Sequence, residues 1–129
     1  MNAKPMLLVV EDEPLVALEV EDTLRDGGYD VLSANNGDAA LEAIEKHGKD
    51  LAGLVTDIRW QTGPDGWEVA TAARKANHTI PIVYMTGDSA ADWAVKGVPK
   101  SVLLQKPFTP SQVLTALANL QNEQDSSLE

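Results

Sequence analysis

The feature that most constrains the fold is a regular alternation of short apolar runs with segments of helical pattern. The apolar runs, expected to be buried strands, cover residues 6–10, 30–34, 51–56, 81–86 and 101–105. The expected helices cover residues 14–28, 37–48, 67–76 and 89–97, with a last one from Pro110 after a Thr109 cap. This alternation predicts an α/β domain, a five-stranded parallel sheet flanked by five helices on both faces.

Length and charge limit the classes of function. A chain of 129 residues suggests one domain, which we place at residues 1–121, followed by a polar, frayed tail at 122–129. The net charge of −10 disfavours direct nucleic-acid binding, because phosphate backbones would be repelled. There is no cysteine, no run long enough to cross a membrane and no secretory signal, so a cytoplasmic location is expected.

Charged and polar side chains follow the ends of four expected strands. Glu11 and Asp12 follow the first strand, Asp57 ends the third, Thr86 ends the fourth and Lys106 follows the fifth. The carboxyl ends of parallel strands share one edge of a sheet, where sites form in open α/β folds. Adjacent carboxylates repel one another, and their oxygens suit a hard divalent cation, most often Mg²⁺. The sequence therefore predicts a metal site at this edge.

Glu13 is the third acid of this stretch. We expect it to point away from the cation, at the start of the first helix, where a negative charge suits the helix dipole.

The motifs at these strand ends resemble a known family. The stretches VVEDEP, VTDIR, PDGWEVA, YMTGDSA and LLQKPFTP, in this order, are similar to the receiver domain of two-component response regulators. The resemblance covers nearly the whole chain. It implies a flavodoxin-like sheet with strand order 2-1-3-4-5.

The resemblance also implies a role for each matching residue. Asp57 matches the aspartate that accepts a phosphoryl group, Thr86 the hydroxyl that contacts this group, and Lys106 the lysine that pairs first with Asp57 and then with the phosphate. The Lys106–Pro107 peptide bond is expected to be cis. Asp57 would attack phosphorus directly, since a carboxylate is ionised at neutral pH and needs no general base.

The metal ligands follow in the same way. Asp12 matches the direct Mg²⁺ ligand, Glu11 the acid that reaches the ion mostly through water, and the backbone carbonyl of Arg59 a further ligand beside Asp57. Mn²⁺ is the alternative ion.

Two positions depart from the family pattern. Leu103 stands three residues before Lys106, where many members carry the aromatic ring of the switch, so we expect a switch that does not depend on that ring. Arg59 and Asp88 are expected to face each other as a gate over the phosphoryl group that slows its hydrolysis. A tryptophan is more often found in the core than at an interface, so Trp93 is expected to be buried. Trp93 and Leu103 are also candidates for the output surface.

The predicted function is that of a phosphoacceptor response regulator, which is no enzyme beyond its own phosphorylation and dephosphorylation. The expected partners are a histidine kinase or histidine phosphotransfer protein and an unknown downstream protein, with the chain a monomer or weak dimer. A phosphate sink or relay without output is an alternative. A metal-dependent phosphatase would want a carboxylate where Arg59 stands, and three consecutive acids from Glu11 would repel a flavin phosphate.

Overall fold

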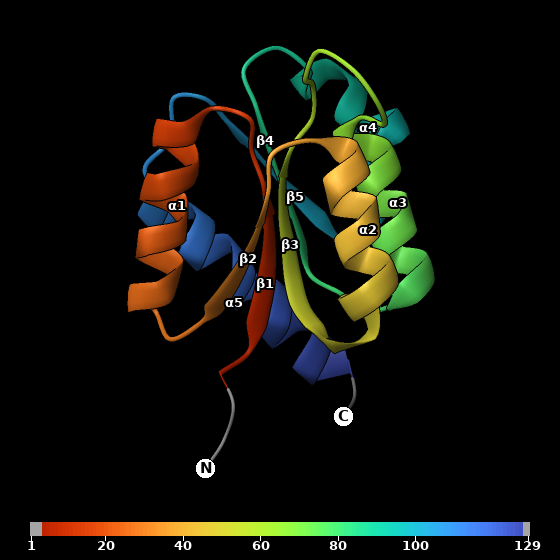
Figure 1. The fold of residues 1–129 in the computed structure, drawn as a ribbon. Helices are drawn as coiled ribbons and strands as arrows, with labels where there is room; N and C mark the ends of the chain where they lie inside the picture. The colour runs from red at the N-terminus through yellow and green to blue at the C-terminus, as the bar shows by residue number, and fades with distance from the viewer. Residues whose placement is uncertain (1–3, 128–129) are drawn as a thin grey trace.

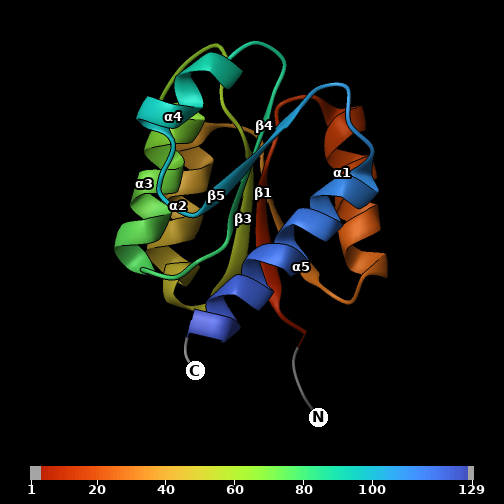
Figure 2. The same ribbon diagram turned by 180° about the vertical axis from the view of Figure 1, so that it is seen from behind.

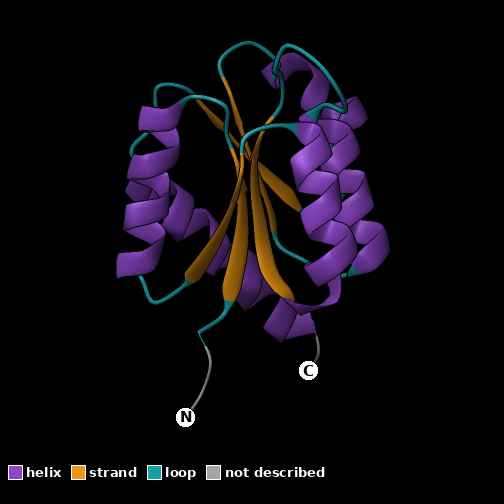
Figure 3. Ribbon diagram, in the orientation of Figure 1, coloured by secondary structure: helices purple, strands orange, loops and turns teal. Residues whose placement is uncertain are grey.

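The computed structural model describes residues 4–127, and the side chains of residues 4–123. Five parallel strands form one sheet in the order β2-β1-β3-β4-β5, with helices on both sides (Figures 1 and 3). The strands are β1 (Met6–Val10), β2 (Asp30–Ala34), β3 (Leu51–Asp57), β4 (Ile82–Thr86) and β5 (Ser101–Gln105). The α-helices are α1 (Pro14–Asp26), α2 (Gly37–His47), α3 (Gly66–Ala76), α4 (Trp93–Lys96) and α5 (Pro110–Ser127). The predicted fold class and strand order are confirmed.

The sheet separates two apolar clusters, one under each helical layer. Helices α1 and α5 cover one face, and α2, α3 and α4 lie on the other (Figures 1 and 2). Side chains alternate between the two faces along β1: Leu7 and Val9 pack toward α1 and α5, while Leu8 and Val10 pack toward α2 and α3. Burial on both faces explains why the strands are nearly continuous apolar runs.

Polar side chains cap the N-terminal ends of two helices. The Asn36 side chain accepts the N–H of Ala39 at 2.8 Å and so caps α2, and Asp65 caps α3 in the same way, accepting from Glu68 at 3.0 Å. Pro14 occupies the first position of α1, as predicted, where its missing N–H costs nothing. These caps set where the helices begin, beside the carboxyl ends of the strands.

The segment between β4 and β5 differs from its prediction. In place of one helix over residues 89–97, there is a 3₁₀ turn, η2 (Ala90–Asp92), followed by the single turn of α4. The end lies within one residue of the prediction, and the difference is at the start, where the Ser89 N–H donates to Thr86 Oγ1 and its hydroxyl bonds to Arg59 instead of joining a regular helix. Trp93 lies on the surface, 38% exposed, with its indole N–H donating to Ser101 Oγ at 3.0 Å. The expectation that it packs in the core is therefore wrong.

Helix α5 also departs from the expected tail. Its buried stripe is the predicted one, Val113, Leu117 and Leu120, but the helix continues to Ser127. The residues after 121 include no glycine or proline before that point, so nothing in them breaks the backbone hydrogen bonds of the helix. The domain boundary at 121 stays a prediction. Across residues 4–127, no helix combines the length and hydropathy needed to cross a bilayer.

The sheet brings the predicted site residues to one edge. Val10 pairs with Thr56 across β1 and β3, so the residues that follow them, Glu11 and Asp57, lie side by side. Asp57 in turn pairs with Met85 of β4, which places Thr86 next to the same edge. The N–H of Lys106 donates to the carbonyl of Thr86 at 2.7 Å and extends the contact to the end of β5.

Candidate functional site

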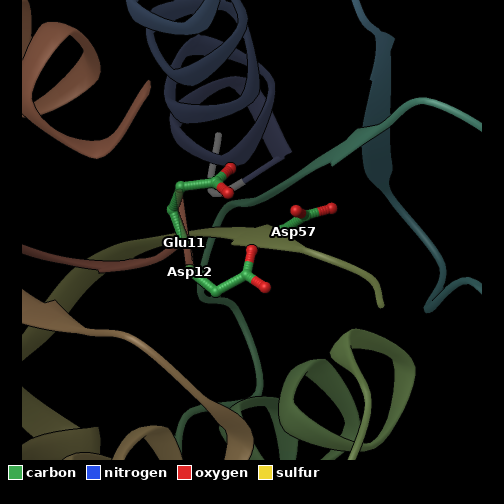
Figure 4. Close-up of side chains that lie close together, drawn as sticks. All are labelled: Glu11, Asp12 and Asp57. Carbon is green, nitrogen blue, oxygen red and sulfur yellow. The ribbon is translucent and has the colours of Figure 1, made fainter. Parts of the chain in front are cut away.

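Three carboxylates form the centre of the candidate site. Glu11 and Asp12 follow β1 and Asp57 ends β3, and each offers an oxygen within 4.8 Å of the other two (Figure 4). Glu11 is 3% exposed and Asp57 is 7% exposed, whereas Asp12 lies open to solvent. The cluster therefore has two buried carboxylates and an exposed one, and carboxylate oxygens are ligands that suit a hard divalent cation such as Mg²⁺.

Lys106 provides the positive charge of the site. Its Nζ lies 3.2 Å from Asp57 Oδ2 and 3.3 Å from Glu11 Oε2. The Lys106–Pro107 peptide bond is cis, which confirms the prediction. The other carboxylate oxygen of Asp57, Oδ1, accepts the N–H of Ile58 at 2.7 Å, so both oxygens of this side chain are held.

Glu13 does not point away as expected. Its Oε1 lies 3.8 Å from Lys106 Nζ, and its backbone N–H donates to Glu11 Oε1 at 3.1 Å. It precedes α1 as the N-cap residue, but its side chain makes no capping hydrogen bond. The attraction of the half-buried lysine outweighs that of the helix dipole, which is a weak effect at an exposed position.

Burial and mutual repulsion set the charge state of the cluster. Burial and the neighbouring Asp57 raise the pKa of Glu11 from 4.5 to about 7, although Lys106 and the N–H of Glu13 act against them. Burial lowers the pKa of Lys106, but the charges of Asp57 and Glu11 outweigh this effect and leave it raised. One lysine thus does not neutralise the acids around it, and a further cation would be attracted.

Thr86 ends β4 at this edge, and the loop that follows folds back onto its side chain. Its side chain is buried, and its Oγ1 accepts the N–H groups of Asp88 at 3.2 Å and Ser89 at 2.8 Å. A Cβ atom added at Gly87 would meet nothing within 4 Å, so the space beside this loop is open.

Arg59 and Asp88 face each other, as the sequence predicts, but Arg59 makes closer contacts elsewhere. Arg59 Nε lies 3.9 Å from Asp88 Oδ1, while it donates to Ser89 Oγ at 2.7 Å. Arg59 Nη2 also lies 3.5 Å from Asp92 Oδ2. Sequence reasoning did not single out Ser89 or Asp92, since a serine and an aspartate after a strand usually indicate a turn.

One strand that leads to the site carries a buried aromatic side chain, on β4 instead of the family's usual β5. Tyr84 of β4 is fully buried and pairs with Leu103 across β4 and β5. Its ring centroid is 4.7 Å from that of Trp67, and its hydroxyl accepts the N–H of Val98 at 3.1 Å. Leu103 is half-buried against the same apolar cluster. The only sequence signal for Tyr84 is an aromatic residue two positions before Thr86, a pattern that buried strands commonly show.

Trp60, in the loop after β3, packs against this cluster as well. Its indole N–H donates to the carbonyl of Pro64 at 2.7 Å and closes the loop after β3 on itself.

The pKa of Glu11 predicts an effect of pH on stability. The raised pKa means that the folded state keeps a proton that the unfolded state loses between pH 4.5 and about 7, so stability falls as the pH rises through this range. Glu11→Gln cannot ionise and removes this loss. Without divalent cations, we expect urea unfolding to show the variant about 1–3 kcal/mol more stable than the wild type at pH 8, with a smaller difference at pH 5. Glu19→Gln, at an exposed position of α1, is the control. A difference that grows toward acid pH would contradict this expectation.

Comparisons with known proteins identify the family. The family model for the response regulator receiver domain matches residues 7–118. A solved response regulator receiver protein from Sinorhizobium medicae is 42% identical with a TM-score of 0.88, covering 92% of this chain and 95% of that one. The chemotaxis protein CheY4 of Vibrio cholerae is 27% identical with a TM-score of 0.79, covering 92% of this chain and 99% of that one.

Curated relatives are longer proteins. PhoP of Bacillus subtilis, an alkaline phosphatase synthesis transcriptional regulatory protein, is 32% identical over 115 residues, which are 88% of this chain and 46% of PhoP. The sensor protein EvgS of Escherichia coli is 31% identical over 119 residues, 91% of this chain and 10% of EvgS. The chain thus spans about half or less of the length of these two relatives. With the match to residues 7–118, the chain belongs to the family of response regulator receiver domains.

Proposed function

We propose that this domain accepts a phosphoryl group on Asp57, with Mg²⁺, from a histidine kinase or a histidine phosphotransfer protein, and that the transfer changes a protein-interaction surface. The observation that carries the proposal is the position of the buried Asp57 carboxylate, 3.2 Å from Lys106 Nζ and within 4.8 Å of oxygens of Glu11 and Asp12. Membership of the receiver family supports it.

The residues present account for the chemistry of the transfer. An oxygen of Asp57 forms a bond to phosphorus while the bond from phosphorus to the donor nitrogen breaks, and the electron pair stays on the leaving imidazole. Lys106 offsets negative charge on the phosphoryl oxygens, and the Thr86 hydroxyl donates a hydrogen bond to one of them. Asp12, Asp57, the Arg59 carbonyl and, through water, Glu11 would hold Mg²⁺, which supplies further positive charge when bound.

An exposed apolar surface favours signalling output over a phosphate sink or relay. Trp93 and Val95 of α4 are large apolar residues on the surface, and Val95 is 88% exposed. Together with Leu103 on the adjacent strand, they offer a downstream protein an apolar contact. The metal-dependent phosphatase is less well supported, since Arg59 stands where its second carboxylate would be. We propose a cytoplasmic monomer or weak dimer without direct nucleic-acid contact.

The primary experiment is phosphorylation of the purified protein by acetyl phosphate and Mg²⁺, followed by intact-mass measurement. The wild type is expected to gain one phosphoryl group, and Asp57→Asn and metal-free wild type are expected to gain almost none. Asp65→Asn, which changes an aspartate of the same loop outside the carboxylate cluster, is the matched control and should be phosphorylated. Equal phosphorylation of Asp57→Asn would show that the assignment is wrong.

The replacement of the usual aromatic by Leu103 predicts where the structure responds. Leucine has no polar tip to exchange between solvent and core, so the response should pass through the loop after Thr86 and through α4. Amide hydrogen exchange with and without beryllofluoride, a phosphate mimic, is expected to change in residues 86–98. Changes confined to the loop after Asp57 would contradict this.

The third expectation concerns the lifetime of the phosphorylated protein. A guanidinium over the phosphoryl group would obstruct the attacking water, and Asp88 would keep it from acting as an arginine finger. Arg59→Ala and Asp88→Ala are therefore expected to shorten the lifetime, by up to about tenfold for each 1.36 kcal/mol of barrier lost. Arg25→Ala on α1 is the control for loss of a surface arginine. A longer lifetime in Arg59→Ala would instead identify an arginine finger.

A further inference from the structure

Ser89 engages its hydroxyl and both of its backbone groups in hydrogen bonds. It lies in the loop before η2 and is 2% exposed. Its N–H donates to Thr86 Oγ1 at 2.8 Å, and its carbonyl accepts the N–H of Asp92 at 3.1 Å. Its hydroxyl accepts the Nε–H of Arg59 at 2.7 Å and donates to Asp88 Oδ1 at 2.9 Å. One buried residue thus joins the site hydroxyl, the neighbouring guanidinium and the start of the next helical turn.

The bonds to Thr86 determine what its hydroxyl can still do. A hydroxyl has two acceptor positions and one donor. Both acceptor positions of Thr86 Oγ1 are taken, by the N–H groups of Asp88 and Ser89. Among residues 4–123, whose side chains the structure describes, this O–H donates to no acceptor within hydrogen-bond range. Donation toward a phosphoryl oxygen on Asp57 is therefore the function left to it.

The bond to Arg59 decides which residue holds the guanidinium. The Arg59–Ser89 hydrogen bond, at 2.7 Å, is shorter than the contacts of Arg59 with Asp88 at 3.9 Å and Asp92 at 3.5 Å. Both aspartates are partly open to solvent, where ion pairs contribute little. Ser89 is buried, and a hydrogen bond to a charged group is among the stronger ones. Asp88 then acts on Arg59 mainly by accepting the Ser89 hydroxyl proton.

We infer that Ser89 is a positioning residue for the phosphoryl-transfer site, one that fixes the Thr86 hydroxyl through its amide and the Arg59 guanidinium through its hydroxyl. The inference rests on the proposed phosphorylation of Asp57. The two halves are separable, because replacing the side chain removes the hold on Arg59 and leaves the amide bond to Thr86. Ser89 therefore sets the lifetime of the phosphorylated state through Arg59, without being needed for its formation.

A double-mutant cycle on the lifetime of the phosphorylated protein tests this. Ser89→Ala, Arg59→Ala and the double variant are phosphorylated with acetyl phosphate and Mg²⁺, and loss of the phosphoryl group is followed by intact mass. We expect each single variant to lose the phosphoryl group about three- to tenfold faster than the wild type, and the double variant to be no faster than Arg59→Ala. Ser89→Thr keeps the hydroxyl and should retain the wild-type lifetime. Thr115→Val, an exposed hydroxyl on α5, is the control.

Three results would overturn the inference. The first is an unchanged lifetime in Ser89→Ala, and the second is a double variant whose increase in hydrolysis rate equals the product of the two single increases. The third is a folded Ser89→Thr with a lifetime as short as that of Ser89→Ala. NMR of the unphosphorylated protein gives a readout that is independent of the transfer. The Nε–H of Arg59 should be protected from solvent exchange in the wild type and lose this protection in Ser89→Ala. Failure of the wild type to gain a phosphoryl group, with this protection intact, would instead refute the proposed function.

Discussion

The candidate site depends on one unbalanced charge arrangement, in which two buried carboxylates share a single lysine. Glu11 and Asp57 lie at the ends of the two central strands, and Lys106 Nζ is 3.3 Å and 3.2 Å from their oxygens. Burying a charge is costly unless it is paired, and here the pairing is incomplete because Asp12 and Glu13 add further negative charge. The raised pKa of Glu11 expresses this deficit. An excess of carboxylate charge at the edge of a sheet is the kind of environment that binds a hard divalent cation.

The fold holds this arrangement in place through main-chain contacts. The parallel pairing of β1 with β3 puts Glu11 next to Asp57, and the bond from the N–H of Lys106 to the carbonyl of Thr86 joins β5 to β4 at the same edge. The apolar strands are buried on both faces, so a slip in register would move every side chain to the other cluster. Burial of both faces therefore fixes the strand register, and the strand register fixes the positions of the charged groups at the strand ends.

Most of this could be predicted from sequence, because strands and strand-end residues follow local patterns. The strands Met6–Val10, Asp30–Ala34 and Ser101–Gln105 have their predicted bounds, and the acids and lysine meet as expected. The strand order could be predicted only from the family resemblance, because hydrophobic periodicity does not show which strands are neighbours in the sheet. Other features depend on tertiary contacts. Glu13 is placed by Lys106, and the exposed Trp93 by its hydrogen bond to Ser101. The short α4 follows from the bond between Ser89 and Arg59. No local pattern encodes those contacts.

The coupling between the site and α4 is polar, in contrast to the aromatic switch that the family resemblance would suggest. Leu103 has no polar group, and Tyr84, although aromatic, is fixed in the core by Trp67 and by the N–H of Val98. Moving the Tyr84 ring out of the core would expose apolar surface and leave the N–H of Val98 without its partner, which makes Tyr84 a poor switch. The hydrogen bonds of Ser89 connect Thr86 to η2 within a few residues, and the hydroxyl groups of Thr86 and Ser89 can change partners by rotation without exposing apolar surface. For the proposed phosphorylation of Asp57, the hydrogen bonds of this loop therefore offer a more direct route to α4 than repacking of the core around Tyr84.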